Sequence, residues 1–316
     1  MTVSEQSLAF LFPGQGSQSI GMLADLAEEF QEVGNTFQEA SDALGYDLFE
    51  LVSKGPVERL NETEYTQPAM LAAGVSVWRV WQKVSDVRPA FMAGHSLGEY
   101  TALVCAESLS FRDAIGLVRE RAKLMQQAVP VGVGAMAAII GLEDDAVVGA
   151  CEKASKDEEK ASPANFNAPG QVVIAGHAEA VSRAIEHAKA AGARRCVLLP
   201  VSVPSHCALM SEAALRFRES LAAVPFVSPQ CRIIHNVDVL EHVDADGIRT
   251  SLEKQLSGSV KWTETVLRFS GLGVNRFFEC GPGPVLAGLN KRIVSEALTL
   301  GLSDPSMLKK AKELWA

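Results

Sequence analysis

A serine between two glycines is the residue of this sequence best suited to act as a nucleophile. Residues 94–98 read Gly-His-Ser-Leu-Gly and match G-x-S-x-G with Ser96 at the centre. The pattern lies between a predicted strand and a predicted helix, which is the setting of a nucleophile elbow. The glycines allow a sharp turn that exposes the hydroxyl, and the N–H of Leu97 at the helix start points to where an oxyanion would form. The alternative is a tight turn around a buried serine.

A nucleophilic serine needs a base, and the sequence contains six histidines. His206 follows a segment punctuated by prolines, where the chain is expected to return to a large domain, and His235 ends a predicted strand. Either could serve, and either could be a structural imidazole. No acid can be assigned to complete a triad, because the aspartates between Ser96 and His206 carry no signature. Those aspartates are Asp113, Asp144, Asp145 and Asp157, and the histidines set aside are His95, His177, His187 and His242.

An arginine lies on the apolar side of a predicted helix. Residues 111–125 form an amphipathic pattern begun by Ser110, with Asp113 as its capping-box partner. At about 100° per residue, Arg121 falls within the apolar stripe of this helix. It either extends its charged head from the edge of the stripe to solvent, or presents its planar guanidinium to a carboxylate ligand.

The elements that must position these residues alternate between strands and helices. The order predicts an α/β fold: a large α/β-hydrolase-like domain with a mostly parallel sheet. One helix is predicted over 66–84, entered at Pro68, a residue favoured at the first helical position. The predicted strands of the large sheet are 8–12, 89–93, 232–236 and 276–279.

The segment over 134–199 has a different rhythm, β-α-β-β-α-β, which is the ferredoxin-like order. We therefore predict a small ferredoxin-like domain at 130–202, inserted into a large catalytic domain formed by 1–129 and 203–316. The elements of the small domain are predicted at 136–140, 143–155, 163–167, 171–175, 177–191 and 195–199.

Composition limits the classes of function. The 316 residues are 47% hydrophobic and 21% charged, as in a globular protein, and no apolar run approaches the roughly 20 residues of a membrane span. Residues 1–7 lack the pattern of a signal peptide. The six cysteines contain no CxxC pair, which argues against a zinc site or a disulfide framework and favours a reducing cytoplasm. A net charge of −9 argues against nucleic acid as a partner, but a local basic patch could still dock an acidic protein.

Six linked motifs extend this interpretation from the elbow to most of the chain. In their order and spacing they strongly resemble the malonyl-CoA:acyl carrier protein transacylase family of bacterial fatty acid synthesis, and the resemblance runs from about residue 8 to Ile293. The motifs are Phe12-Pro-Gly-Gln-Gly-Ser-Gln18, Gly94-His-Ser-Leu-Gly-Glu-Tyr100, Arg121, Asn165-Phe-Asn-Ala-Pro-Gly170, Val203-Pro-Ser-His-Cys-Ala-Leu-Met210 and Glu279-Cys-Gly-Pro-Gly283.

The resemblance implies a [acyl-carrier-protein] S-malonyltransferase that works by ping-pong transfer through a malonyl-Ser96 intermediate. It assigns His206 as the base and the main-chain carbonyl of Gln255 as the group that orients it. The backbone N–H groups of Gln15 and Leu97 would stabilise the oxyanion, and Arg121 would hold the malonyl carboxylate. The segment after Gln255 departs from the family pattern, with Gly258-Ser259 where an asparagine-proline pair is common.

Composition and the resemblance together predict a cytoplasmic monomer without cofactor or metal. The resemblance implies malonyl-CoA and acyl carrier protein as partners, and the charge and hydropathy argue against nucleic acid and a membrane. The candidate carrier-docking patch comprises Lys189, Arg194 and Arg195, and Lys291 and Arg292 could face the same cleft from the other side. The alternative is that all five are solvated surface charges. Two other functions compete: a serine hydrolase or thioesterase of the same fold, and a non-catalytic acyl-CoA-binding or carrier-docking subunit. A polyketide synthase acyltransferase domain is disfavoured, because no flanking module is present. Arg121 argues against a plain hydrolase, which has no use for a carboxylate anchor. The presence of both Ser96 and His206 argues against a non-catalytic subunit.

Overall fold

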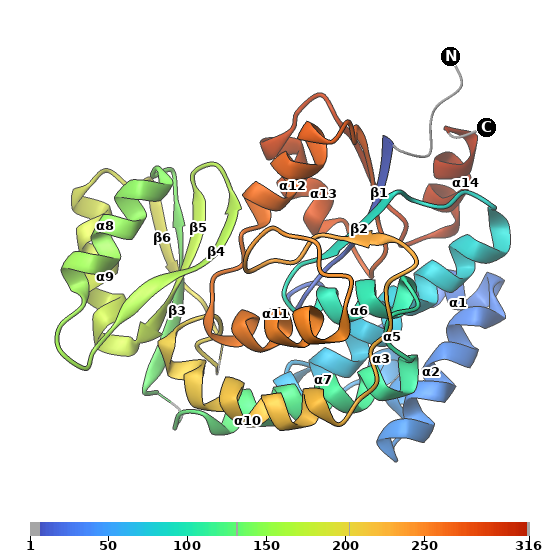
Figure 1. Cartoon of the computed structure of the whole chain (residues 1–316), viewed down its shortest axis with the longest axis horizontal. Coiled ribbons are helices and arrows are strands. Elements are labelled where there is room, and N and C mark those ends of the chain that lie inside the picture. Colours follow the sequence, from blue (N-terminus) through green and yellow to red (C-terminus); the bar gives the residue numbers. More distant parts are fainter. Residues whose placement is uncertain (1–6, 131, 202, 315–316) are drawn as a thin grey trace.

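The computed structural model describes residues 7–130, 132–201 and 203–314, which form two separate β-sheets with helices packed around them (Figure 1). Residues 1–6, where no signal peptide is expected, lie outside the described residues, as do 131, 202 and 315–316. The prediction of an α/β fold with one parallel sheet is confirmed, and the second sheet is antiparallel.

The larger sheet has five strands in the order β7-β2-β1-β8-β9, and every neighbouring pair is parallel. All residues of the central strand β1 and of its neighbour β2 are buried, as expected where helices cover both faces of a parallel sheet. The strands are β1 (Leu8–Phe12), β2 (Phe91–Gly94), β7 (Arg232–Ile233), β8 (Arg276–Glu279) and β9 (Leu298–Gly301).

Alternate residues of β1 enter different hydrophobic cores, because successive side chains of a strand point to opposite faces of the sheet. Phe10 and Phe12 pack with the helices α1 to α7, α10, α11 and α14, whereas Ala9 and Leu11 pack with α12 and α13. The helices are α1 (Ala24–Glu29), α2 (Gln31–Leu44), α3 (Leu48–Lys54), α4 (Val57–Leu60), α5 (Thr63–Val84), α6 (Gly98–Cys105), α7 (Phe111–Gln127), α10 (Ser211–Ala222), α11 (Ala245–Ser257), α12 (Trp262–Gly271), α13 (Val285–Ile293) and α14 (Pro305–Glu313).

The smaller sheet, drawn in green and yellow at the left of Figure 1, has the order β4-β5-β3-β6 and antiparallel neighbours. Two helices cover one of its faces, and their side chains form a core of their own. Its elements follow the order βαββαβ: β3 (Gly134–Ile140), α8 (Asp144–Ala154), β4 (Ala161–Ala168), β5 (Gln171–His177), α9 (Ala178–Ala190) and β6 (Arg195–Leu198). The domain limits at 130 and 202 stay predictions.

Strand β4 also contacts the larger part of the molecule. The N–H of Phe166 donates to the carbonyl of Val260 at 2.9 Å, and the N–H of Val260 donates to the carbonyl of Ala164 at 2.8 Å. The two sheets are therefore connected by backbone hydrogen bonds next to the start of α12, close to the elements that carry the site.

Two predicted boundaries are wrong. Helix α5 begins at Thr63, so Pro68 lies inside the helix and not at its first position. The ring removes one backbone donor in the second turn, and the polar residues before it, which begin the helix, give no apolar signal. The predicted strand over 232–236 forms paired strand only at Arg232 and Ile233. The N–H of Ile234 still donates to the carbonyl of Met92 at 3.2 Å, and Asn236 bonds to the elbow instead of continuing the ladder.

Candidate active site

Ser96 lies between β2 and α6 with a backbone φ of 52°, in the left-handed region that side chains rarely adopt. The glycines on both sides are required by close backbone approaches. A Cβ at Gly94 would lie 1.8 Å from the carbonyl carbon of Gly98, and a Cβ at Gly98 would lie 2.0 Å from the carbonyl oxygen of Phe12. The G-x-S-x-G spacing thus forms a sharp turn here, and the alternative of a buried, unreactive serine gives no reason for the hydroxyl contacts that follow.

The hydroxyl of Ser96 lies 2.7 Å from Nε2 of His206. The other ring nitrogen, Nδ1, lies 2.7 Å from the main-chain carbonyl of Gln255. A carbonyl oxygen only accepts, so Nδ1 carries the proton and Nε2 is free to accept from the serine. The structure therefore brings these three predicted residues together in the geometry of a nucleophile, a base and a group that orients the base.

His206 is buried, and this decides its protonation state. Burial, and next the positive charge of Arg121, lower the pKa of His206 to about 3. The imidazole is thus neutral at physiological pH, which is the form that can accept a proton. Among the described residues its Nδ1 partner is a carbonyl and not a carboxylate, which fixes the tautomer without adding a charge.

Arg121 is 1% exposed, so its guanidinium does not reach solvent and the snorkelling alternative is wrong. It donates to Oε1 of Gln67 at 2.8 Å, to Oε1 of Gln255 at 3.0 Å and to the hydroxyl of Ser96 at 3.2 Å. Within the described chain it forms no ion pair, and its Nε has no acceptor. A buried cation is costly to leave unpaired, so the site is suited to a ligand carboxylate beside the serine.

The turn after β1 lies against the elbow. Phe12 and Gly94 are paired at the ends of β1 and β2, and a Cβ at Gly14 would lie 2.7 Å from the carbonyl oxygen of His95. Of the described residues, neither Gln15 nor Leu97 donates its backbone N–H to a protein acceptor. Two free donors at the same edge of the sheet can stabilise a developing oxyanion.

Sequence reasoning missed the residues behind the nucleophile. Asn236 accepts a hydrogen bond from the N–H of Ser96 through Oδ1 at 2.7 Å and donates to the carbonyl of Gly94 at 2.7 Å. His235, the other candidate base, contacts Glu99 and not the serine. The position of Asn236 after a strand of the parallel sheet was the one available signal, since strand ends gather at a single edge.

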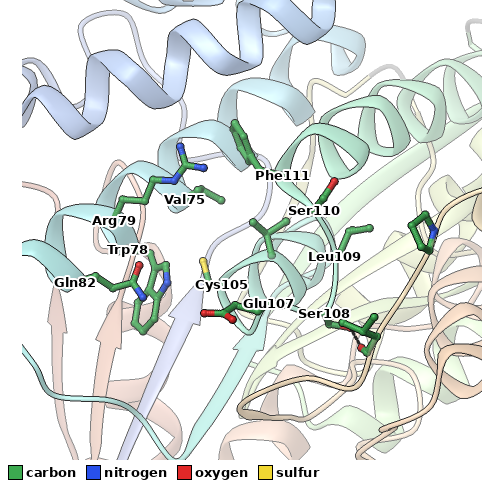
Figure 2. A pocket seen from close by; sticks show the side chains of 13 residues that line it. Val75, Trp78, Arg79, Gln82, Cys105, Glu107, Ser108, Leu109, Ser110 and Phe111 are labelled. Atoms are coloured by element: carbon green, nitrogen blue, oxygen red, sulfur yellow. Dashed lines mark hydrogen bonds between the residues drawn. The ribbon is translucent and has the colours of Figure 1, made fainter.

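A surface pocket of about 460 Å³ lies apart from these residues, between α5, the start of α7 and residues 225–227. Figure 2 shows Trp78, Arg79 and Glu107 around it, and none of Ser96, His206 and Arg121 lines it. It is not part of the site. No group of three metal-binding side chains and no helix able to cross a membrane occurs among the described residues.

Comparison with known proteins gives concordant matches. The model of the acyl transferase domain family matches residues 9–303. The chain is 54% identical over 306 residues to malonyl CoA-acyl carrier protein transacylase of Escherichia coli K12, covering 97% of this chain and 99% of the relative. It is 41% identical to the Bacillus subtilis protein of that name, covering 96% of each.

Solved structures agree. A crystal structure of an acyl carrier protein S-malonyltransferase from Vibrio cholerae superposes with a TM-score of 0.95 at 55% identity, covering 97% of this chain and all of that one. A malonyl-transacylase in complex with its type II PKS acyl-carrier protein superposes with a TM-score of 0.96 at 52% identity, covering 98% and 99%.

Proposed function

This chain belongs to the acyl transferase family and, within it, to the malonyl-CoA–acyl carrier protein transacylases, and from this premise we propose that Ser96 carries the malonyl group between the two substrates. The overall reaction is the transfer of a malonyl group from malonyl-CoA to an acyl carrier protein for fatty acid synthesis. The roles of the individual residues are proposals, and they are supported by the geometry around the elbow.

In the first half-reaction, Ser96 gives its proton to Nε2 of His206 while its oxygen attacks the thioester carbonyl. The backbone N–H groups of Gln15 and Leu97 stabilise the oxyanion, each by about 3 kcal/mol if they act like measured donors of this kind. The carbon–sulfur bond then breaks, and the coenzyme A thiolate takes the proton from His206. Malonyl-Ser96, an ester, remains.

The second half-reaction reverses these steps with a different thiol. The phosphopantetheine thiol of the carrier protein gives its proton to His206, and the thiolate attacks the ester. The serine oxygen leaves, recovers the proton, and the malonyl thioester of the carrier is released. The single observation that carries this proposal over hydrolysis is the buried guanidinium of Arg121, 3.2 Å from the serine hydroxyl, which suits an acyl group bearing a carboxylate.

The experiment is intact mass spectrometry of the enzyme after brief mixing with malonyl-CoA, before and after addition of carrier protein. A malonyl adduct that survives in buffer and disappears when holo-carrier is added supports transfer. A hydrolase or thioesterase would lose the adduct to water at the same rate without carrier, and a non-catalytic binding subunit would form no adduct. Ser96→Ala is the control and should form none.

We also propose where the carrier protein docks. Arg195 begins β6 and lies opposite Ile140 of β3, and Ile140 also lies opposite Gln171 of β5. The predicted basic residues before β6 therefore lie at the same end of the small sheet as the β4–β5 turn. Arg292 of α13 donates to the carbonyl of Pro169 in that turn at 3.2 Å. Two residues before Pro169, Asn167 contacts Nε2 of His95, the elbow residue, at 2.8 Å. We call this group of positive residues the basic edge. It lies near the site through the β4–β5 turn, and its positive charge suits an acidic carrier. The group comprises Lys189, Arg194, Arg195, Lys291 and Arg292.

The strand order β4-β5-β3-β6 together with the order βαββαβ supports a ferredoxin-like class for the small unit, and the elbow supports an α/β-hydrolase-like class for the large one. We propose that the enzyme works as a cytoplasmic monomer without cofactor or metal, and without nucleic acid or a membrane as partner.

A further inference from the structure

A buried polar cluster behind the nucleophile has no part in the steps above. It consists of Glu99 in the first turn of α6 and of His235 and Asn236 after β7, and all three are 0% exposed. Oε1 of Glu99 accepts a hydrogen bond from Nδ1 of His235 at 2.6 Å, and Oε2 accepts from the N–H of Asn236 at 3.3 Å and from the side-chain amide of Gln255. A carboxylate can accept all three at once, because its oxygens only accept when ionised.

Gln255 connects this cluster to the reacting groups. Its Nε2 donates to Glu99 and to the carbonyl of Ser96 at 3.0 Å, and its Oε1 accepts from Arg121 at 3.0 Å. An anion on one side and a cation on the other determine which way the amide points. The main-chain carbonyl of the same residue accepts from His206.

Asn236 connects the cluster to the elbow. Its side chain bonds to the N–H of Ser96 and to the carbonyl of Gly94, and so holds the two peptide groups that flank His95, the residue before the serine. The left-handed φ of Ser96 is unfavourable and persists only where the surroundings hold it. Glu99 in turn accepts the N–H of Asn236, which places the backbone that carries this side chain.

We infer that Glu99, paired with His235, is the positioning residue of this site: it aligns Gln255 and Asn236, which hold Arg121, the ring of His206 and the backbone of Ser96. The inference rests on the roles proposed above for the three residues that are held. Glu99 is not proposed to touch a substrate atom. It acts through the direction of the Gln255 amide and through the conformation of the elbow.

The test is Glu99→Gln, which keeps the shape and removes the charge. The glutamine side chain can then point in two ways. If its oxygen faces His235, its NH2 faces the donors of Gln255 and Asn236. If its NH2 faces Nδ1 of His235, the ring proton must sit on Nε2, where it is an unpaired buried donor. We expect kcat for malonyl transfer, per acylatable enzyme, to fall about tenfold or more, with a fall in the preference for malonyl over acetyl. The matched control is Glu279→Gln, the same change at another carboxylate that is 0% exposed, with rates per acylatable enzyme unchanged.

A double-mutant cycle separates positioning from general stability. In a Gln255→Ala background, Glu99→Gln should have little further effect on the malonyl-to-acetyl preference, because the side chain through which Glu99 acts is gone. An unchanged preference in the single variant, or fully additive losses in the cycle, would overturn the inference. If Glu99→Gln does not fold, Glu99→Asp withdraws the carboxylate from Gln255 and must still lower the preference. Formation of malonyl-Ser96 by the wild type tests the proposed function independently.

Discussion

The guanidinium of Arg121 donates a 3.2 Å hydrogen bond to the hydroxyl of Ser96, 25 residues earlier in the chain. The group proposed to recognise the substrate thus contacts the atom proposed to react with it. The other partners of Arg121 are the neutral amides of Gln67 and Gln255. A carboxylate bound at Arg121 would therefore be the first anion to pair with this charge, and it would place its acyl group beside the serine oxygen.

Replacing Arg121 should lower the transfer of malonyl groups but not that of acetyl groups. Arg121→Ala is expected to lower malonyl transfer about 10²-fold or more, because losing one partner of a buried charge pair costs on the order of 2–5 kcal/mol. Acetyl transfer should be spared or improved, since acetyl has no carboxylate to hold. The measurement is kcat/KM with both coenzyme A esters. Arg119→Ala, on the same helix with a partly exposed ion pair to Glu64, is the control. Equal losses for both esters would show that Arg121 is structural.

The pH dependence of acylation should report the environment of His206. Its pKa of about 3 keeps the imidazole neutral between pH 8 and pH 5, so kcat/KM for acetyl-CoA should show no decline near pH 6.5 caused by this residue. Arg121 is the second cause of the lowered pKa, after burial. Arg121→Ala should therefore move the decline of kcat/KM at low pH to a higher pH. A wild-type decline at the ordinary histidine pKa, or a decline that Arg121→Ala leaves in place, would contradict this interpretation.

Much of the site could be predicted from local pattern. The turn at Ser96 follows from its two glycines, and the place of Arg121 on the apolar stripe follows from helical periodicity, since both signals lie within a few residues of the site they describe. Periodicity left open whether the guanidinium is buried, and the structure shows that it is. The choice of His206 over His235 could not be made from the residues, because both follow apolar or proline-containing segments. Their difference lies in partners distant in sequence: His206 meets Ser96, and His235 meets Glu99.

Other parts of the site needed the fold itself. Asn236 bonds to Ser96 across 140 residues, and Gln255 reaches the same residue across 159. No periodicity of an isolated segment encodes such contacts. The orientation of His206 by the main-chain carbonyl of Gln255 leaves no trace in side-chain type, so the family resemblance alone suggested it. The large sheet was predictable because continuous apolar runs mark strands buried on both faces, whereas the two-residue strand β7 gave too little pattern.

Glu279 should make stability depend on pH. Burial raises its pKa to about 7, although the N–H groups of Leu286 and Ala287 donate to it. Because the folded pKa lies above the unfolded one, the contribution is present below about pH 4.5 and is lost as pH rises toward 7, by on the order of 3 kcal/mol. Glu279→Gln removes this pH dependence, so the stability of the variant relative to the wild type should increase between pH 5 and pH 8. Urea unfolding of both proteins at pH 5 and at pH 8 measures the free energy of unfolding. A difference between the two proteins that is the same at both pH values would refute the prediction.

The basic edge at the β4–β5 turn should govern only the second half-reaction. Lys189 and Arg194 are exposed, and the molecule as a whole carries a net charge of −9, so a local patch must provide any attraction to an acidic carrier. The test is the double variant Lys189→Glu with Arg194→Glu. Acylation of Ser96 by malonyl-CoA should be unchanged, because coenzyme A esters are not expected to depend on these two side chains.

Transfer to the carrier should slow in that variant and lose its dependence on ionic strength, since screening no longer removes an attraction. The control is Lys153→Glu with Lys156→Glu: both residues are exposed, the charge change is the same, and they lie where α8 ends and β4 approaches, at the opposite end of the small sheet. Stopped-flow transfer from isolated malonyl-enzyme to holo-carrier at several salt concentrations measures the effect. If the two double variants behave alike at low ionic strength, the carrier protein docks on another surface.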